Sequence, residues 1–244
     1  MIGLNIYVTE KLKLNKDSGL KYSYAPSNKQ ELDSILRDLF EERGRDADLN
    51  DVDVSKITDM SDLFKIIDRY YGRNFIRNID ISEWDVSNVK TFDNAFTGCS
   101  RFNCDLSGWD VSSCTNFESM FEGCVDFESD LSDWDMTAAE NIKFMFLNCQ
   151  HINFNVSKWT FSKKCNDFVR VFEGCVRFKG NGINNWDMKD AKNIFRMFQD
   201  CRSMKESPKK WDIKYGAIDM QDAFTGCDAI RNDLPWWYDQ QYKP

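Results

Sequence analysis

The sequence is poor in the residues and segments on which catalysis, export and membrane insertion depend. His151 is its one histidine, so neither a second imidazole nor a catalytic triad is expected around it. No run of about 18 apolar residues occurs, which argues against insertion into a membrane. The first residues lack a basic segment followed by a long apolar one. We therefore expect no secretory signal, and a cytoplasmic or virion-associated protein rather than a secreted one.

The sequence also lacks an excess of basic residues and the residue spacings that are typical of metal sites. Acidic residues outnumber basic ones and give a net charge of −8, which argues against nucleic acid as a partner. Cys104, Cys114 and Cys165 form no Cys-x-x-Cys pair of zinc spacing, and the glycines form no phosphate-binding loop. We therefore predict no catalytic residue, no metal and no cofactor, in a protein that is not an enzyme.

The chain has instead a unit that recurs about every 25 residues, and one copy occupies residues 106–124. Tryptophan and phenylalanine return at the same place in successive copies, which requires parallel coils stacked face on face. The tryptophan column is Trp84, Trp109, Trp134, Trp159, Trp186 and Trp211. The phenylalanine column is Phe64, Phe96, Phe121, Phe146, Phe172, Phe198 and Phe224.

Each position of the unit predicts a local conformation. The Leu-Ser-x-Trp-Asp-Val segment alternates with the period of a short strand. A capping residue follows, and a residue that tolerates positive φ comes two positions after the phenylalanine, which predicts a helix of one to two turns between them. The expected caps are Asp59, Thr91, Asn116, Asn141, Asp167, Asn193 and Asp219, and the expected stops are Gly98, Gly123, Asn148, Gly174, Asp200 and Gly226. The predicted fold is an α/β solenoid of short parallel strands and short helices.

Cysteine follows the same period. Cys99, Cys124, Cys149, Cys175, Cys201 and Cys227 occupy one position in successive units. A buried thiol behaves as a small apolar group, and the odd total of nine favours a reduced compartment. The pattern predicts a ladder of packed thiols rather than disulfides.

The repeat divides the chain into three predicted parts. Residues 1–50 are expected to form an α/β N-terminal cap, with strand character at 4–8 and 21–24 and a helix that Ser27 or Asn28 caps and Gly44 ends. Residues 51–231 are expected to form seven coils, and 232–244 a tryptophan-rich C-terminal cap.

The pattern Phe-x-Gly-Cys-x-x-Phe-Asn-x-Asp-Leu-Ser-x-Trp-Asp-Val-Ser at 96–112 resembles the BspA-type leucine-rich-repeat-like family. The resemblance covers roughly residues 51–238. It implies a leucine-rich-repeat-like solenoid that is not an enzyme. Members are described as bacterial surface or adhesion proteins, and similar repeats are encoded by mycoplasmas and by phages of gut bacteria. Because no export signal or anchor is recognised here, a phage or intracellular protein is also a reasonable expectation.

An acidic column beside the tryptophans has two interpretations. Asp85, Asp110, Asp135, Asp187 and Asp212, interrupted by Thr160, would place polar groups about 4.8 Å apart along a strand face. In the first interpretation the column is functional, as a ladder of metal ligands or an acidic recognition strip. In the second it is structural, and each Asp accepts local backbone N–H bonds in a turn. Repulsion between like charges favours the turns. The unit of Thr160 also carries Lys158, Lys163 and Lys164. This unit is either a local docking site or a repeat whose sequence has diverged.

Two irregularities are the predicted partner-binding sites, because loops inserted into a rigid scaffold often carry binding. The first is a seven-residue expansion around 66–75 with Arg69, Tyr70, Tyr71 and Arg73, unless its tyrosines pack on the N-terminal helix. The second is the C-terminal end, where Trp236 and Tyr238 either cover the last coil or mark a docking surface.

These patterns predict a non-enzymatic repeat scaffold that mediates protein–protein binding or adhesion. Its protein partner is not identified by the sequence. The alternative function is a structural or decoration component of a larger assembly, such as a phage virion.

Overall fold

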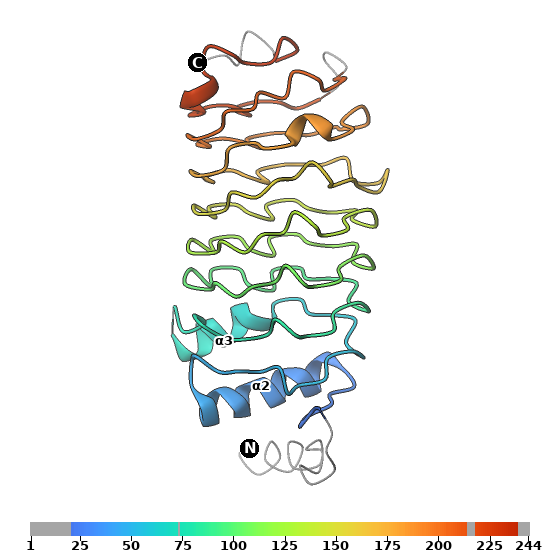
Figure 1. The fold of residues 1–244 in the computed structure, drawn as a ribbon, viewed down its shortest axis with the longest axis vertical. Helices are drawn as coiled ribbons and strands as arrows, with labels where there is room; N and C mark the ends of the chain where they lie inside the picture. Colours follow the sequence, from blue (N-terminus) through green and yellow to red (C-terminus); the bar gives the residue numbers. More distant parts are fainter. Residues whose placement is uncertain (1–20, 73, 214–217, 239–244) are drawn as a thin grey trace.

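The computed structural model describes residues 21–72, 74–213 and 218–238, and its coils form an elongated stack (Figure 1). Helix α2 (Lys29–Arg43) lies across the N-terminal end of the stack, and helix α3 (Leu63–Tyr71) belongs to the first coil. Two single-turn 3-10 helices, η2 (Ile183–Asn185) and η3 (Asp228–Ile230), lie toward the C-terminal end.

Helix α2 is the predicted N-terminal helix. The side-chain oxygen of Asn28 accepts the N–H of Glu31 at 3.0 Å, and Gly44, with a φ of 75°, ends the helix. Its apolar face, Leu32, Ile35, Leu36, Leu39 and Phe40, is buried. The strand expected at 4–8 lies outside the described residues, and of 21–24 only Tyr24 pairs, in a bridge with Val52.

The predicted leucine-rich-repeat-like α/β solenoid is wrong in its secondary structure. No strand forms in the described ranges, where neighbouring coils share only isolated parallel bridges such as Asn116 with Asn141. The segments expected as strands are joined between coils by indole groups: Trp134 Nε1 donates to the Leu106 carbonyl at 2.9 Å. Because a parallel sheet needs evenly spaced backbone bonds, side-chain links of this kind do not make one.

The short helices expected after each cap are also wrong, except in the first coil. The third residue after each expected cap has a positive φ, which a right-handed helix does not allow. These residues are Asp62, Asn94, Ser119, Phe144, Arg170, Arg196 and Asp222, with φ between 52° and 58°. The expected caps open turns instead, as when Asn116 Oδ1 accepts the N–H of Glu118 at 3.1 Å. The expected stops do have positive φ, from 60° to 78°.

A one-way ladder of backbone hydrogen bonds takes the place of strands and helices. We define the ladder segment of a coil as the residues from its expected cap to its expected stop, such as 116–123. The N–H groups of Phe117, Ser119, Phe121 and Gly123 donate to carbonyls of Asn141, Lys143, Met145 and Leu147 in the next coil, at 2.7 to 2.9 Å. The intervening N–H groups close turns within the coil, as in Met120 to Phe117. The ladder donors therefore point toward the C-terminal end of the stack and its acceptors toward the N-terminal end.

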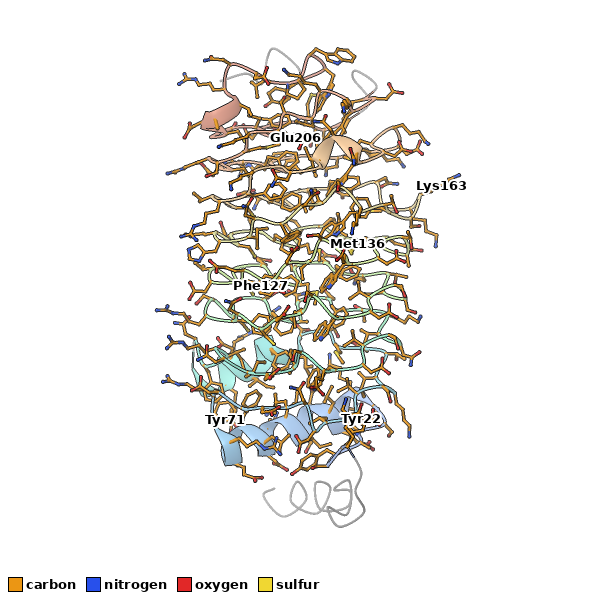
Figure 2. The ribbon with its side chains drawn as sticks, in the orientation of Figure 1. Tyr22, Tyr71, Phe127, Met136, Lys163 and Glu206 are labelled. Carbon is orange, nitrogen blue, oxygen red and sulfur yellow. The ribbon has the colours of Figure 1, made fainter. Side chains whose placement is uncertain are left out.

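The predicted columns fill the interior. Phe121 is fully buried, with its ring centroid 5.5 Å from that of Phe96 and 5.6 Å from that of Phe146. Phe127 packs beside it at 4.3 Å, and Figure 2 shows Phe127 within the stack. The six cysteines of the column are buried and free, as predicted, and the off-column Cys104, Cys114 and Cys165 are buried and free as well. The ladder thiols also hydrogen-bond between coils, and Cys149 Sγ donates to the Phe121 carbonyl at 2.8 Å.

Candidate functional site

The predicted binding loop corresponds to the second half of α3 and the turn that follows it. Ile66 and Tyr70 lie four residues apart, on one face of the helix, and are 41% and 64% exposed. The guanidinium carbon of Arg37 in α2 lies 5.4 Å from the ring centroid of Tyr70, within cation–π range. Arg69 is exposed next to Tyr70 in the chain. We refer to Arg37, Ile66, Arg69 and Tyr70 as the α3 surface.

A buried carboxylate shapes the turn after α3. Asp68 is 3% exposed, and its two oxygens accept the N–H groups of Ile76 at 2.9 Å and Asn74 at 3.2 Å. The neighbouring Tyr71 faces inward, since its hydroxyl donates to the Arg37 carbonyl at 3.1 Å and its ring stacks on Phe75 at 4.5 Å. Burial raises the pKa of Tyr71. Tyr71 thus packs on the N-terminal helix, whereas Tyr70 meets that helix only through Arg37 and remains 64% exposed. Arg73 lies outside the described residues.

The second predicted site lies at the opposite end of the stack (Figure 1). Trp236 is 76% exposed, whereas Tyr238 is buried with its ring edge-on to Phe224 at 5.0 Å. The adjacent Trp237 continues the tryptophan column by stacking on Trp211 at 5.7 Å. Tyr238 therefore covers the last coil, and the structure does not bring the two predicted groups into one surface.

The acidic column forms turns. The Oδ1 atoms of Asp85, Asp110, Asp135 and Asp187 accept the N–H of the residue two positions later, at 3.0 to 3.3 Å. For Asp212 that position lies outside the described residues. Hydrogen bonds from Ser112, chiefly from its hydroxyl, hold the pKa of Asp110 below its usual range. Among the described residues, no three His, Cys, Asp or Glu side chains come together as a metal ion would require.

The turn role of this column makes a testable prediction at Asp110. The Asp110→Ala substitution removes the acceptor of the Ser112 N–H, and we expect it to lower the free energy of unfolding by about 1 kcal/mol. Asp110→Asn keeps a side-chain oxygen and should change it by less than about half of that. Urea unfolding of both variants measures the difference. An Asn variant as unstable as the Ala variant would mean that the charge matters more than the hydrogen bond.

The coil of Thr160 lacks one of the bridges between coils, although its ladder hydrogen bonds continue, as in Phe146 N–H to the Val171 carbonyl at 3.0 Å. No bridge joins Asn141 to Asp167, although both are described and the equivalent residues on either side are bridged. A cavity of about 270 Å³ opens here between the turns at 160–165 and 185–191. Lys158 pairs with Asp133, and Lys164 Nζ lies 2.7 Å from Glu140 Oε1, while Lys163 projects from the edge of the stack (Figure 2). Acidic groups of the preceding coil therefore offset most of the predicted basic charge.

The three off-column cysteines are buried, and the single histidine lies among carboxylates. Burial raises the pKa of the off-column thiols, to about 11 for Cys104 and about 12 for Cys114 and Cys165. The thiolate is the reactive form, so at neutral pH these groups are inert. His151 lies at the surface with Nδ1 3.6 Å from Glu128 Oε1 and 4.0 Å from Asp126 Oδ1, in a charged row.

Comparison with protein families gives a match across most of the chain. The family described as "Mycoplasma protein of unknown function, DUF285" matches residues 34–159, 69–183 and 140–237. The chain belongs to this family. DUF285 is related to the BspA-like repeat proteins, and three overlapping matches are what an array of similar units produces. Neither the comparison with curated proteins nor that with solved structures gives a match.

This DUF285 chain places two residues in the α3 surface that the sequence analysis missed. Ile66 could have been found from its four-residue spacing to Tyr70, which is helical. Arg37 carried no such signal, because its approach to Tyr70 depends on how α2 crosses the first coil. Within the described ranges, no helix has both the length and the apolar character needed to cross a membrane.

Proposed function

We propose that this chain is a non-enzymatic scaffold of BspA-type repeats that binds a protein partner through the α3 surface. One observation carries the proposal. Of the three large apolar side chains exposed among the described residues, Ile66 and Tyr70 lie together on one helix face, next to Arg37 and Arg69. Tyrosine and arginine around an apolar centre are typical of the residues that dominate protein interfaces.

The surroundings of the α3 surface also favour binding. Asp68 fixes the turn after the helix and Tyr71 anchors the helix to α2, so Tyr70 projects from a rigid base. A partner that binds such a surface orders few protein side chains, which reduces the entropic cost of association. The net charge of −8 favours a protein partner over nucleic acid.

Affinity capture tests the proposal. The immobilised protein is incubated with a lysate of its source cells, and the retained proteins are compared with those held by Tyr70→Ala and Ile66→Ala variants. We expect either substitution to weaken the specific partner at least tenfold, as truncation of a hot-spot residue does. The matched control is Trp236→Ala, which removes an exposed aromatic ring at the other end and should leave capture unchanged.

The alternative, a decoration component of a larger assembly such as a phage virion, gives a different result. The wild-type protein would then form obligate oligomers or particles in size-exclusion chromatography with light scattering. A monomer whose partner is retained equally by wild type, Tyr70→Ala and Ile66→Ala would contradict binding through the α3 surface.

A further inference from the structure

The C-terminal end of the stack presents backbone donors that no described residue accepts. In the coil below, the N–H groups of Arg196, Phe198 and Asp200 bond to carbonyls of the last coil at 3.0, 2.9 and 2.8 Å. The equivalent donors of the last coil are Asp222, Phe224 and Gly226, 26 residues later in each case. Because the ladder runs one way, these three N–H groups point out of the end of the stack.

A small cavity lies beside the same donors. It has a volume of about 90 Å³, and its lining includes Phe224 and Gly226 together with two charged residues, Asp228 and Arg231. Arg231 is exposed, and its guanidinium forms no ion pair with a described carboxylate. The end of the stack thus combines three aligned backbone donors with an unpaired cation, which is complementary to carbonyl and carboxylate oxygens.

The other end of the stack excludes a second copy as the natural occupant. The Ser61 carbonyl of the first coil faces α2, because Lys29 Nζ donates to both the carbonyl and the hydroxyl of Ser61, the latter at 2.7 Å. A copy stacked head to tail would meet this covered end with its donors. The occupant must instead be a chain segment whose carbonyls are free.

We propose that the C-terminal end of the stack binds an extended segment of a partner protein. Carbonyls at alternate residues of that segment accept the N–H groups of Asp222, Phe224 and Gly226, and an acidic side chain pairs with Arg231. The partner thereby adds one ladder segment, much as a peptide adds a strand to an open sheet edge. Tyr238 already covers the ring of Phe224, so the contact is mainly polar. This surface is separate from the α3 surface and shares with it only the class of partner.

Amide exchange in the free protein gives the first test. The N–H groups of Asp222, Phe224 and Gly226 should exchange with deuterium at least about tenfold faster than those of Arg196, Phe198 and Asp200, which are bonded to the next coil. Equal protection of the two sets would overturn the proposal, because the end would already be occupied.

A peptide probe gives the second test. The probe is a peptide with the sequence of residues 219–226, blocked at both termini. Within the protein, carbonyls of this segment accept the N–H groups of the preceding coil, and the segment carries two aspartates. Titrated into ¹⁵N-labelled protein, it should shift the resonances of Asp222, Phe224 and Gly226. Thioamides at peptide positions 221, 223 and 225 should weaken binding about tenfold, since sulfur is the poorer acceptor. Thioamides at 220, 222 and 224 are the matched control and should change it less than about twofold.

The Arg231→Gln variant should bind the peptide about threefold more weakly, and Arg231→Lys should recover part of the loss. Shifts confined to the α3 surface would overturn this inference while leaving the proposed function intact. A concentration-dependent dimer that protects the same three amides would also overturn it, because the occupant would then be a second copy. Loss of capture in Tyr70→Ala bears only on the α3 surface.

Discussion

Raising the pH from 8 to 10 is expected to unfold the protein. All nine cysteines are buried, and burial raises the pKa of every thiol from about 9, to about 11 in Cys104 and about 12 in Cys114, Cys165 and Cys227. Above pH 9 the unfolded chain loses these protons while the folded chain keeps them, so the free energy of unfolding falls as pH rises. Each thiol contributes on the order of 1 kcal/mol over this window, so the nine together approach the whole stability of a typical domain.

Urea unfolding at pH 7.5, 8.5, 9.0 and 9.5 with a reductant present measures this loss. The control is the double variant Cys124→Ala with Cys175→Ala, which removes two of the ladder thiols. Its stability should be lower at pH 7.5, but it should fall with pH by roughly a fifth less than that of the wild type. A free energy of unfolding that stays constant from pH 7.5 to 9.5 would show that the thiols ionise alike in both states.

The Phe121→Ala substitution is expected to cost about 3–5 kcal/mol of stability. The ring is fully buried, and it contacts the same column above and below, at Phe96 and Phe146, and Phe127 at its side. Each coil contacts only its neighbours, so a cavity at this level weakens both of its interfaces. Urea unfolding at neutral pH measures the change.

Phe195→Ala is the matched control for Phe121→Ala. Phe195 is only partly buried, and its ring contacts the guanidinium groups of Arg170 and Arg196 rather than the column. We expect its loss to cost about 1 kcal/mol. Similar costs for the two variants would contradict a stack that depends on its phenylalanine column.

The core could be predicted from the sequence because side-chain type alone sets it. Trp134, Phe146 and Cys149 recur at a fixed interval with apolar neighbours, and all three are buried. The backbone conformation could not be predicted in the same way. Phe144 and Arg170 have φ of 58° and 53°, although bulky residues rarely adopt such values. Their N–H groups donate to Val169 and Phe195 of the next coil, so the next coil imposes a conformation that no local pattern indicates.

The candidate site, too, could be predicted from the sequence only in part. The expansion that carries Arg69 and Tyr70 is visible as a break in the repeat, and the structure places both residues at the surface. Tyr70 and Tyr71 are identical in type, and the rotation of about 100° between consecutive helical positions of α3 separates the exposed ring from the packed one. Arg37 lies at the site because α2 crosses the first coil, and the repeat pattern does not predict that crossing.

Photo-crosslinking in the source cells tests binding through the α3 surface most directly. A benzophenone amino acid is placed at position 70, or at position 110 in the acidic column as the control, and both proteins are irradiated and analysed by mass spectrometry. We expect one partner protein to crosslink from position 70 and not from position 110, and we expect Ile66→Ala to abolish the crosslink. A partner that crosslinks from position 110 alone would contradict binding through the α3 surface.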